Sequence, residues 1–273
     1  MPELPEVETV RNELAPRVIG RTIRDVTLVW DGIVREPAPA EFCAGVIGQA
    51  VESVRRRGKY LFIGLGNGRY LVVHLKMTGS LIVGSATDEP PRFTRAVIHL
   101  DDGTAVFFRD PRKFGVLRLV DDVGFLEEKL GPEPLDEGFT PEVFAGRLAR
   151  RTAPIKAALL DQKVLAGVGN MYADEVLHAA GINPWRPAGS LTREETDRLY
   201  REIRRILWAA IGNKGASVDT YFRPDGSEGS AHYEFKVAHG LGGGRCSYCG
   251  GEIRREVVRG RGSYYCPRCQ PLK

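Results

Sequence analysis

The sequence predicts a multidomain α+β protein with an N-terminal helix, an antiparallel β-sandwich or barrel, a helical domain and a C-terminal zinc hairpin. Three observations predict this order. Short apolar strands broken by turn residues run from about Arg21 to Val120, and helical periodicity follows residue 141. Two Cys-x-x-Cys pairs then lie close to the C-terminus. A chain of 273 residues is long enough for two domains that each bury a core.

Composition and charge narrow the functional classes. With 42% hydrophobic and 27% charged residues, the chain is typical of a globular protein. No apolar run is long enough to span a bilayer, and the charged N-terminus is unlike a signal peptide, so a cytoplasmic protein is expected. The net charge is +4, yet residues 240–273 alone carry +5, from seven Lys or Arg and two Glu. A basic C-terminal module favours a polyanionic partner.

The first residues predict a helix over 5–15. Pro5 suits its first turn, Glu6 suits its positive end, and Pro16 is expected to stop it. Removal of Met1 would leave Pro2 with a free secondary amine beside Glu3. An amine nucleophile next to a carboxylic acid suits imine chemistry on a sugar aldehyde. The alternative is that these prolines and glutamates only begin a helix.

Eight strands are expected in the next hundred residues because Val, Ile, Leu and aromatic runs alternate with turn signals. Asn67-Gly68 and Asp102-Gly103 predict hairpin turns. A Pro- and Gly-rich stretch, Gly131 to Pro141, is interpreted as an interdomain linker. The expected strands are Thr22–Trp30, Val51–Arg56, Tyr60–Leu65, Tyr70–Leu75, Ser80–Val83, Ala96–Leu100, Thr104–Phe108 and Gly115–Val120.

Four helices are expected after the linker. Thr140 and Thr192 are candidate N-caps, and Glu195 would complete a capping box with Thr192. Residues 213–240, rich in Gly, Ser and charge, predict a mobile loop. The expected helices are Pro141–Arg151, Ile155–Asp161, Asn170–Ala180 and Arg193–Gly212.

The four C-terminal cysteines predict one structural zinc ion. Cys246 and Cys249 form one pair, and Cys266 and Cys269 form the other after a sixteen-residue spacer. The segments Ile253–Val258 and Gly262–Tyr265 predict a hairpin between the pairs. Two disulfides are the alternative, but a cytoplasmic compartment keeps thiols reduced. Cys43 is interpreted as a core thiol.

Five motifs, taken together and in order, resemble the bacterial formamidopyrimidine-DNA glycosylases. They are Met1-Pro2-Glu3-Leu4-Pro5-Glu6, His74-Leu75-Lys76-Met77-Thr78-Gly79, Asp110-Pro111-Arg112-Lys113-Phe114-Gly115, Ala166-Gly167-Val168-Gly169-Asn170-Met171-Tyr172 and Gly260-Arg261-Gly262 before Cys266-x-x-Cys269. The resemblance implies an N-terminal helix and β-sandwich, a helix–two-turn–helix domain, and a zinc finger on a β-hairpin, with DNA between the domains. The implied domains are 1–130 (catalytic β-sandwich), 131–141 (linker), 142–239 (helical, with a lesion-capping loop at about 213–239) and 240–273 (zinc finger).

The resemblance also implies catalytic roles. Pro2 would attack the anomeric carbon of the damaged nucleotide, expel the base and form an iminium, after which both flanking phosphates are eliminated. Glu3 would protonate the sugar ring oxygen, and Glu6 would support the site. Lys59 matches a phosphate-binding lysine of the family. For its neighbours Arg55, Arg56 and Arg57, DNA contact and a solvated charged face remain equal alternatives.

Further residues match DNA contacts of the family. His74, Asn170 and Arg261 correspond to phosphate contacts, although Asn170 alone would be interpreted as a helix N-cap. Met77, Arg112 and Phe114 match the residues that fill the gap left by a flipped base. Met77 and Phe114 could otherwise be core residues, but both lie in turn signatures, which favours the gap-filling role.

Two positions depart from the family pattern. Asp219 stands where a basic residue is usual, and His239 replaces an aromatic hydroxyl, which puts the lesion spectrum in doubt. The expected activity is a glycosylase and AP lyase for oxidised purines. The alternatives are the sister class for oxidised pyrimidines and a non-catalytic zinc-ribbon DNA-binding protein. The expected partner is double-stranded DNA that contains oxidised bases or abasic sites, and no membrane partner is expected. The protein is expected to be a monomer associated with the nucleoid.

Overall fold

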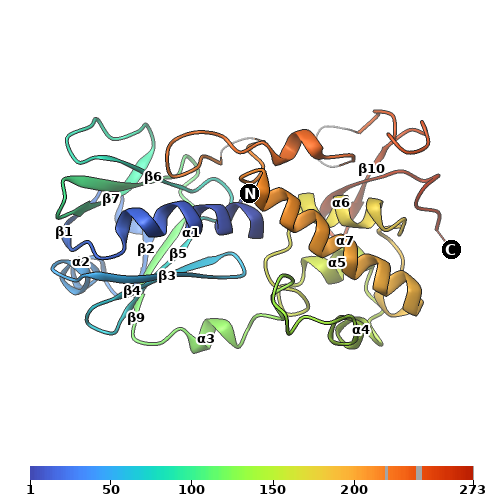
Figure 1. Ribbon diagram of the computed structural model, residues 1–273, viewed down its shortest axis with the longest axis horizontal. Coiled ribbons are helices and arrows are strands. Elements are labelled where there is room, and N and C mark those ends of the chain that lie inside the picture. Colours follow the sequence, from blue (N-terminus) through green and yellow to red (C-terminus); the bar gives the residue numbers. More distant parts are fainter. Residues whose placement is uncertain (219–220, 238–241, 273) are drawn as a thin grey trace. The chain divides into compact units, whose positions relative to one another are not determined.

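The structure, a computed structural model, describes residues 1–218, 221–237 and 242–272. Two compact units divide the chain (Figure 1). Unit 1 comprises Met1–Glu128 and Asn213–His232, and unit 2 comprises Lys129–Gly212 and Tyr233–Lys273. The predicted α+β class is confirmed: a helix and two sheets form unit 1, and helices with a two-stranded hairpin form unit 2. The described part of the chain contains no helix of the length and apolarity that a bilayer crossing requires.

Helix α1 (Leu4–Val18) begins unit 1 and is longer than predicted. Its apolar residues Val7, Val10, Leu14 and Val18 recur every three or four positions and are buried on one face. The expectation that Pro16 ends the helix was wrong. Pro16 lies in the last turn, where its missing N–H removes a single bond, and the helix ends when Ile19 turns extended and donates to Ala15 O.

Two sheets pack as the predicted sandwich. The first is antiparallel throughout, in the order β1 (Ile23–Leu28), β7 (Thr94–Leu100), β8 (Thr104–Arg109) and β6 (Ser80–Ser85). The second has the order β2 (Val34–Glu36), β9 (Val116–Val120), β5 (Tyr70–His74), β4 (Tyr60–Leu65) and β3 (Val51–Arg57). Its β2–β9 pair is parallel, which differs from the predicted all-antiparallel arrangement. The predicted turns at Gly68 and Gly103 are confirmed, both with positive φ.

Besides strand β2, three short elements of unit 1 were not predicted. They are the 3-10 helix η1 (Asp31–Ile33), helix α2 (Pro39–Val46) and helix α3 (Gly124–Glu127). Each is too short for its own periodicity to be read, so tertiary packing decides it. Phe42 and Val46 of α2 are fully buried against the sandwich, and Leu126 of α3 packs on the outer face of the second sheet.

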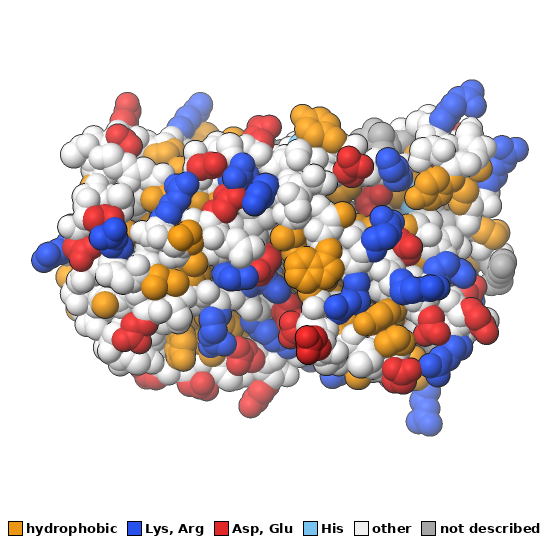
Figure 2. Space-filling model, in the orientation of Figure 1, with side chains coloured by type: hydrophobic (Ala, Val, Ile, Leu, Met, Phe, Trp, Pro, Cys, Tyr) orange, Lys and Arg blue, Asp and Glu red, His pale blue; other side chains and the backbone are white. Residues whose placement is uncertain are grey.

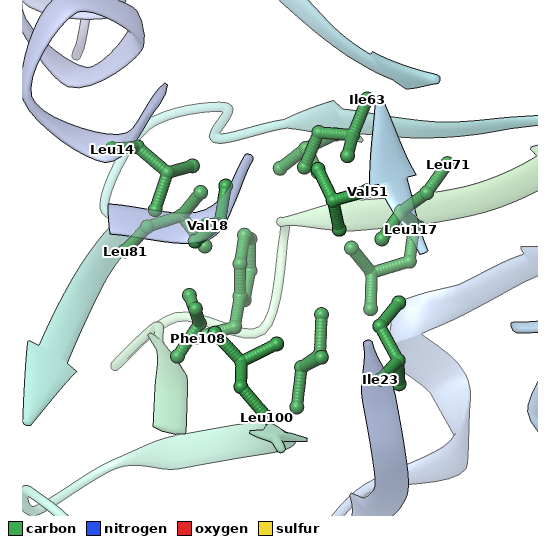
Figure 3. Close-up of a pocket in the computed structure, with 13 residues that line it drawn as sticks. Leu14, Val18, Ile23, Val51, Ile63, Leu71, Leu81, Leu100, Phe108 and Leu117 are labelled. Atoms are coloured by element: carbon green, nitrogen blue, oxygen red, sulfur yellow. The ribbon is translucent and has the colours of Figure 1, made fainter. Parts of the chain in front are cut away.

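The sandwich core is apolar throughout. Figure 3 shows Leu14 and Val18 of α1 meeting Leu81, Leu100 and Phe108 around a small interior space. Every residue that lines this space is aliphatic or aromatic, so it offers a ligand no polar partner. The interior of the sandwich therefore supports the fold and offers no polar site for a ligand.

Unit 2 is built from helices and the C-terminal hairpin. Thr140 caps α4 by accepting the Val143 N–H at 3.3 Å, and Thr192 with Glu195 forms the predicted capping box. The elements are α4 (Pro141–Leu148), α5 (Ile155–Leu160), α6 (Asn170–Ala179), η2 (Ala188–Ser190), α7 (Arg193–Gly212), β10 (Arg254–Val258) and β11 (Arg261–Tyr265). The 3-10 helix η3 (Ala231–Glu234) contains the boundary between unit 1 and unit 2. Figure 2 shows Lys and Arg side chains interspersed with Asp and Glu over α7.

Candidate functional site

The N-terminal residues lie at a buried helix start. Pro2 is buried, and Glu3 is the N-cap of α1 with 1% of its surface exposed. The backbone N–H of Glu3 donates to Glu6 Oε2 at 2.7 Å. These residues do begin a helix, as the simpler interpretation held. That arrangement also fixes a carboxylate beside Pro2, so it is compatible with imine chemistry at the same residues.

Glu6 uses its second oxygen to hold a distant segment. Its Oε1 accepts the Ala216 N–H at 2.8 Å, and Glu6 is fully buried. A Cβ on Gly215 would lie 2.9 Å from Glu6 Cγ, and Gly215 has φ +78°, so this approach requires glycine. One carboxylate therefore joins the helix start to the segment that follows α7.

Residues 213–232 are docked on unit 1 although they follow α7 in the chain. Arg223 Nη2 donates to Glu13 Oε1 of α1 at 2.6 Å, and Val83 N donates to Pro224 O at 2.8 Å. Tyr221 is buried in the sandwich core. The described part of this segment is thus packed in place rather than loose, contrary to the expected mobile loop. Asp219 and His239 lie outside the described residues.

Lys59 and His74 are neighbours at one end of strands β4 and β5 in the second sheet. Lys59 follows Gly58 in the β3–β4 turn and is 8% exposed, while His74 pairs with Tyr60 across β5 and β4. His74 Nδ1 accepts the Lys76 N–H at 2.9 Å. Burial, followed by the charges of Lys76 and Lys59, lowers the pKa of His74 to about 3. The ring is therefore neutral, and Nε2 carries the proton.

The arginines before Lys59 have different environments. Arg56 is nearly buried, and its Nε donates to Glu8 Oε2 of α1 at 2.7 Å. Burial alone would raise the pKa of Glu8, but hydrogen bonds from Arg11 and Arg56 outweigh it and lower the pKa. Arg55 is half exposed and lies 5.8 Å from the Tyr70 ring. The solvated-face interpretation therefore fails for Arg56, which anchors α1 to β3.

Met77, Arg112 and Phe114 lie together at the surface. Met77 is 39% and Phe114 45% exposed, so neither is a core residue. The Arg112 guanidinium lies 4.7 Å from the Phe114 ring centre, and its Nη1 lies 3.7 Å from Met77 Sδ. Two turns thus present one exposed group of a thioether, a guanidinium and a ring.

Asp110 holds both of these turns. It is 1% exposed, and its carboxylate accepts the Thr78 hydroxyl and the Arg112 N–H on Oδ1. Oδ2 accepts the N–H groups of Phe114 and Gly115, each at 2.7 Å. The sequence analysis gave Asp110 no role. An Asp that precedes a Pro in a turn is a signal for such backbone bonds, but the partner Thr78 is visible only in the structure.

In unit 2, α6 and β11 bring Asn170 and Arg261 near each other. Gly169 is the N-cap of α6, so the N-cap interpretation of Asn170 was wrong. Asn170 is the first helical residue, and its Nδ2 donates to Gly262 O at 3.0 Å. Arg261 is exposed at the start of β11, directly after Gly260 with φ +78°. The two predicted phosphate contacts therefore lie close together, because Asn170 bonds the residue that follows Arg261.

A buried ion pair supports this arrangement. Lys156 Nζ lies 2.7 Å from Asp174 Oδ1 and donates to Gly262 O at 2.8 Å. Asp174 Oδ2 accepts the Tyr264 N–H at 3.1 Å. Burial raises the pKa of Asp174 to about 7, although Lys156 opposes this shift. Lys156 and Asp174 were missed by the sequence analysis because neither lies in a recognisable motif.

The four predicted zinc ligands converge. Their Sγ atoms all lie within 4.8 Å of one another, with Cys246–Cys269 at 3.7 Å and Cys249–Cys266 at 3.5 Å. Four sulfurs about 2.3 Å from a tetrahedral ion lie about 3.8 Å apart, so the cluster fits zinc. Disulfide-bonded sulfurs would be about 2.0 Å apart, and all five cysteines are free.

The pKa values of the cysteine thiols depend on their surroundings in the cluster. Burial raises the pKa of Cys266 and of Cys269, whereas the Gly251 N–H, which donates to Cys249 Sγ at 3.4 Å, lowers the pKa of Cys249 to about 7. Four thiolates this close repel one another, and a divalent cation offsets that repulsion. One structural zinc ion accounts for the cluster, and its four protein ligands leave no position for a substrate.

Three family models match successive parts of the chain. The formamidopyrimidine-DNA glycosylase N-terminal domain matches residues 1–117, and the formamidopyrimidine-DNA glycosylase H2TH domain matches residues 130–221. The zinc finger found in FPG and IleRS matches residues 243–272. Two relatives named formamidopyrimidine-DNA glycosylase are similar along the whole chain. The Symbiobacterium thermophilum protein is 46% identical over 100% of this chain and 90% of its own length, and that of Geobacillus kaustophilus is 43% identical over 99% and 100%.

Solved structures agree with these matches. The Lactococcus lactis FPG mutant G226P, in complex with a Fapy-dG containing DNA, has a TM-score of 0.93 and 35% identity over 99% of this chain and 100% of its own. The MutM (FPG) protein of Thermus thermophilus has a TM-score of 0.89 and 42% identity over 100% of both chains. The Lactococcus lactis Fpg with an abasic site containing DNA has a TM-score of 0.92 and 35% identity, with the same coverage as the mutant. The chain therefore belongs to the formamidopyrimidine-DNA glycosylase family.

Proposed function

We propose that this protein is a base-excision DNA glycosylase and AP lyase that removes oxidised purines, such as 8-oxoguanine and formamidopyrimidines, from double-stranded DNA. One observation carries the proposal: Pro2, Glu3 and Glu6 form a buried helix start in a chain that matches this family from end to end. Relatives solved with Fapy-dG and abasic-site DNA support this substrate class. The enzyme would act as a monomer on the chromosome in the cytoplasm.

Pro2 is the proposed nucleophile after Met1 is removed. Its nitrogen forms a bond to C1′ as the bond from C1′ to the damaged base breaks, and the base leaves with a proton. Glu3 gives a proton to the sugar ring oxygen as the ring opens, which leaves an iminium. The iminium acidifies the neighbouring sugar C–H bonds, so the 3′ and then the 5′ phosphate are eliminated. Water finally hydrolyses the Schiff base and frees the amine.

Glu6 supports this chemistry by position. Its Oε2 holds the Glu3 N–H, and its Oε1 holds the Ala216 N–H. A movement of Ala216 would therefore shift the Glu6 carboxylate and, through it, the backbone of Glu3 at the start of α1. Lys59, close to His74, would bind the phosphate beside the damaged nucleotide. We treat Glu6 as a positioning residue and Lys59 as a phosphate-binding residue of the active site.

The exposed group of Met77, Arg112 and Phe114 would enter the duplex. A base cannot react inside the stack, so the enzyme must flip it out and fill the gap. Met77 and Phe114 can replace the lost stacking, and Arg112 can hydrogen-bond the orphaned base. Their exposure and mutual contacts support this role.

The remaining DNA contacts would be phosphates. His74 offers a neutral N–H donor, and Asn170 and Arg261 offer an amide and a guanidinium on adjoining backbone of unit 2. Zinc would keep the hairpin that carries Arg261 folded. By sequence, we assign residues 1–130 to the catalytic domain, 131–141 to the linker, 142–239 to the helical domain with its capping loop, and 240–273 to the finger, although residues 213–232 of the capping loop pack in unit 1.

A panel of duplexes tests the proposal. Single-turnover excision would be measured on otherwise identical duplexes that contain 8-oxoguanine, Fapy-dG, thymine glycol or undamaged guanine. We expect the two purine lesions to react at least tenfold faster than thymine glycol, with 3′- and 5′-phosphate ends in the products. Preference for thymine glycol would indicate the oxidised-pyrimidine class. Tight DNA binding without excision of any lesion would indicate a non-catalytic protein.

A further inference from the structure

A histidine outside the cysteine cluster contacts one of its sulfurs. His178, in the last turn of α6, is 2% exposed, and its Nε2 lies 3.3 Å from Cys246 Sγ. Cys246 is also buried. The ring of Tyr248, between the two cysteines of the first pair, stacks on the His178 ring at 4.9 Å with 6° between the planes. The imidazole is thus fixed both in its plane and toward the sulfur.

Zinc binding at Cys246 determines whether His178 Nε2 or Cys246 Sγ is the hydrogen-bond donor. A cysteine bound to zinc is a thiolate, which has lone pairs and no proton, so it can only accept. An unprotonated Nε2 would place its lone pair against that negative sulfur. A protonated Nε2 instead forms an N–H···S bond, comparable to the bond from Gly251 N to Cys249 Sγ at 3.4 Å. Nδ1 is then the unprotonated ring nitrogen, and it has no partner among the described residues.

His178 completes a polar stripe on α6. Asn170, Asp174 and His178 are spaced four residues apart and so share one face of the helix. Asn170 bonds Gly262 O and Asp174 bonds Tyr264 N, both on the finger hairpin, and His178 contacts the metal-binding sulfur. The helix that presents Asn170 is therefore joined to the finger at its first turn, at its middle and at its last turn.

We propose that His178 is a positioning residue of the zinc site, whose Nε2–H donates a hydrogen bond to the zinc-bound thiolate of Cys246. The bond spreads the negative charge of the thiolate and makes Cys246 harder to protonate or displace. It also locks α6 to the metal, so the zinc ion braces the helix whose first residue is Asn170. Neither effect requires the imidazole to change its charge.

The tautomer of His178 is the direct test. In the zinc-loaded full chain with ¹⁵N-labelled histidine, the ring nitrogens are observed through their couplings to the carbon-bound ring protons, and His178→Phe assigns the signals. We expect Nε2 to carry the proton at neutral pH. Exchange of the proton with water does not hide this result, because the carbon-bound protons report it. A bare Nε2 with the proton on Nδ1 would overturn the proposal.

Zinc release provides the second measurement. The rate of zinc transfer to a chromophoric chelator would be measured without DNA for the wild type, His178→Phe and Trp185→Phe. Phe keeps a ring against Tyr248 but removes the donor, and we expect release about tenfold or more faster, as for other outer-shell partners. Trp185→Phe is the control, since it removes the Trp185 Nε1 bond to Glu256 of the hairpin and leaves the sulfurs untouched. Release from His178→Phe at the wild-type rate, or equal acceleration in both variants, would contradict the proposal.

Discussion

At the scale of single residues, Glu6 has a double task that its place in a helix start conceals. One buried carboxylate accepts the N–H of Glu3 and that of Ala216, which lies more than two hundred residues later in the chain. Two buried donors depend on two oxygens, so the position needs a carboxylate and not merely a polar side chain. The sequence could suggest the first bond from capping rules, but not the second.

Replacement of Glu6 by Gln tests this double role. Gln keeps the size but turns its NH2 toward one of the two donors, which would leave a buried N–H unpaired at about 1–3 kcal/mol. We expect a lower Tm and single-turnover excision slowed by about tenfold or more, since about 1.4 kcal/mol corresponds to a factor of ten. Glu8→Gln is the matched control on the same helix, because Glu8 bonds Arg56 and Arg11 but not Glu3. Equal excision rates in the two variants would refute the role of Glu6.

His74 should act as a neutral donor. Its pKa of about 3 lies below the usual 6.5, so in the folded protein it gains no charge between pH 5.5 and 8. The affinity lost in His74→Gln, measured by fluorescence anisotropy with a duplex that carries a stable abasic-site analogue, should be the same across that range. A loss that grows toward pH 5.5 would show an imidazolium contact instead.

The lowered pKa of His74 also makes the stability of the folded protein depend on pH. The unfolded chain takes up a proton at His74 below pH 6.5, but the folded protein does not until about pH 3. The free energy of unfolding should therefore fall as the pH drops through this window. His74→Gln should reduce this dependence in denaturant titrations, and an unchanged slope would contradict it.

At the scale of elements, the exposed group of Met77, Arg112 and Phe114 depends on two turns that share one buried carboxylate. Asp110 bonds Thr78 in the first turn and three N–H groups in the second. Met77 and Phe114 therefore lie on turns that the Asp110 carboxylate holds by hydrogen bonds. Their function would thus be set by a residue that does not itself reach the surface.

Asp110→Asn should separate base flipping from the chemistry at Pro2. The amide NH2 would face one or more backbone donors, and both turns would lose their shared anchor, at about 1–3 kcal/mol. We expect excision of 8-oxoguanine from a duplex to fall by about 10- to 100-fold. Cleavage at a preformed abasic site, where no base must be flipped, should fall much less.

Asp122→Asn is the control for Asp110→Asn because Asp122 is an exposed aspartate of the same unit. It should leave both activities unchanged. An equal loss of both activities in Asp110→Asn would show general damage to unit 1 rather than a defect in flipping.

Most elements could be predicted because their patterns are local. The β4 and α7 ranges agree with the prediction at both ends; β4 is a largely apolar run, and a capping box marks the start of α7. Strand β2 could not be predicted, because three residues carry no period and its parallel partner β9 lies about eighty residues away. The prediction that Pro16 ends the helix was wrong because a proline in the last turn removes only one backbone hydrogen bond.

At the scale of the whole molecule, the predicted site residues fall into two groups, one in each unit. Unit 1 contains Pro2, Lys59, His74 and the group of Met77, Arg112 and Phe114. Unit 2 contains Asn170, Arg261 and the zinc cysteines. The cysteines could be identified from spacing alone. The supports could not, because Lys156, Asp174 and Gly215 act through contacts between segments that are distant in the sequence.

We propose that the amine of Pro2 forms a Schiff base with the damaged nucleotide, which borohydride would reduce to a stable covalent link. The full chain would be incubated with a duplex that contains one 8-oxoguanine opposite cytosine, reduced, digested and analysed by mass spectrometry. We expect a chain that lacks Met1 and a covalent DNA adduct on Pro2. An adduct on Lys59, or efficient excision by a chain that retains Met1, would contradict it.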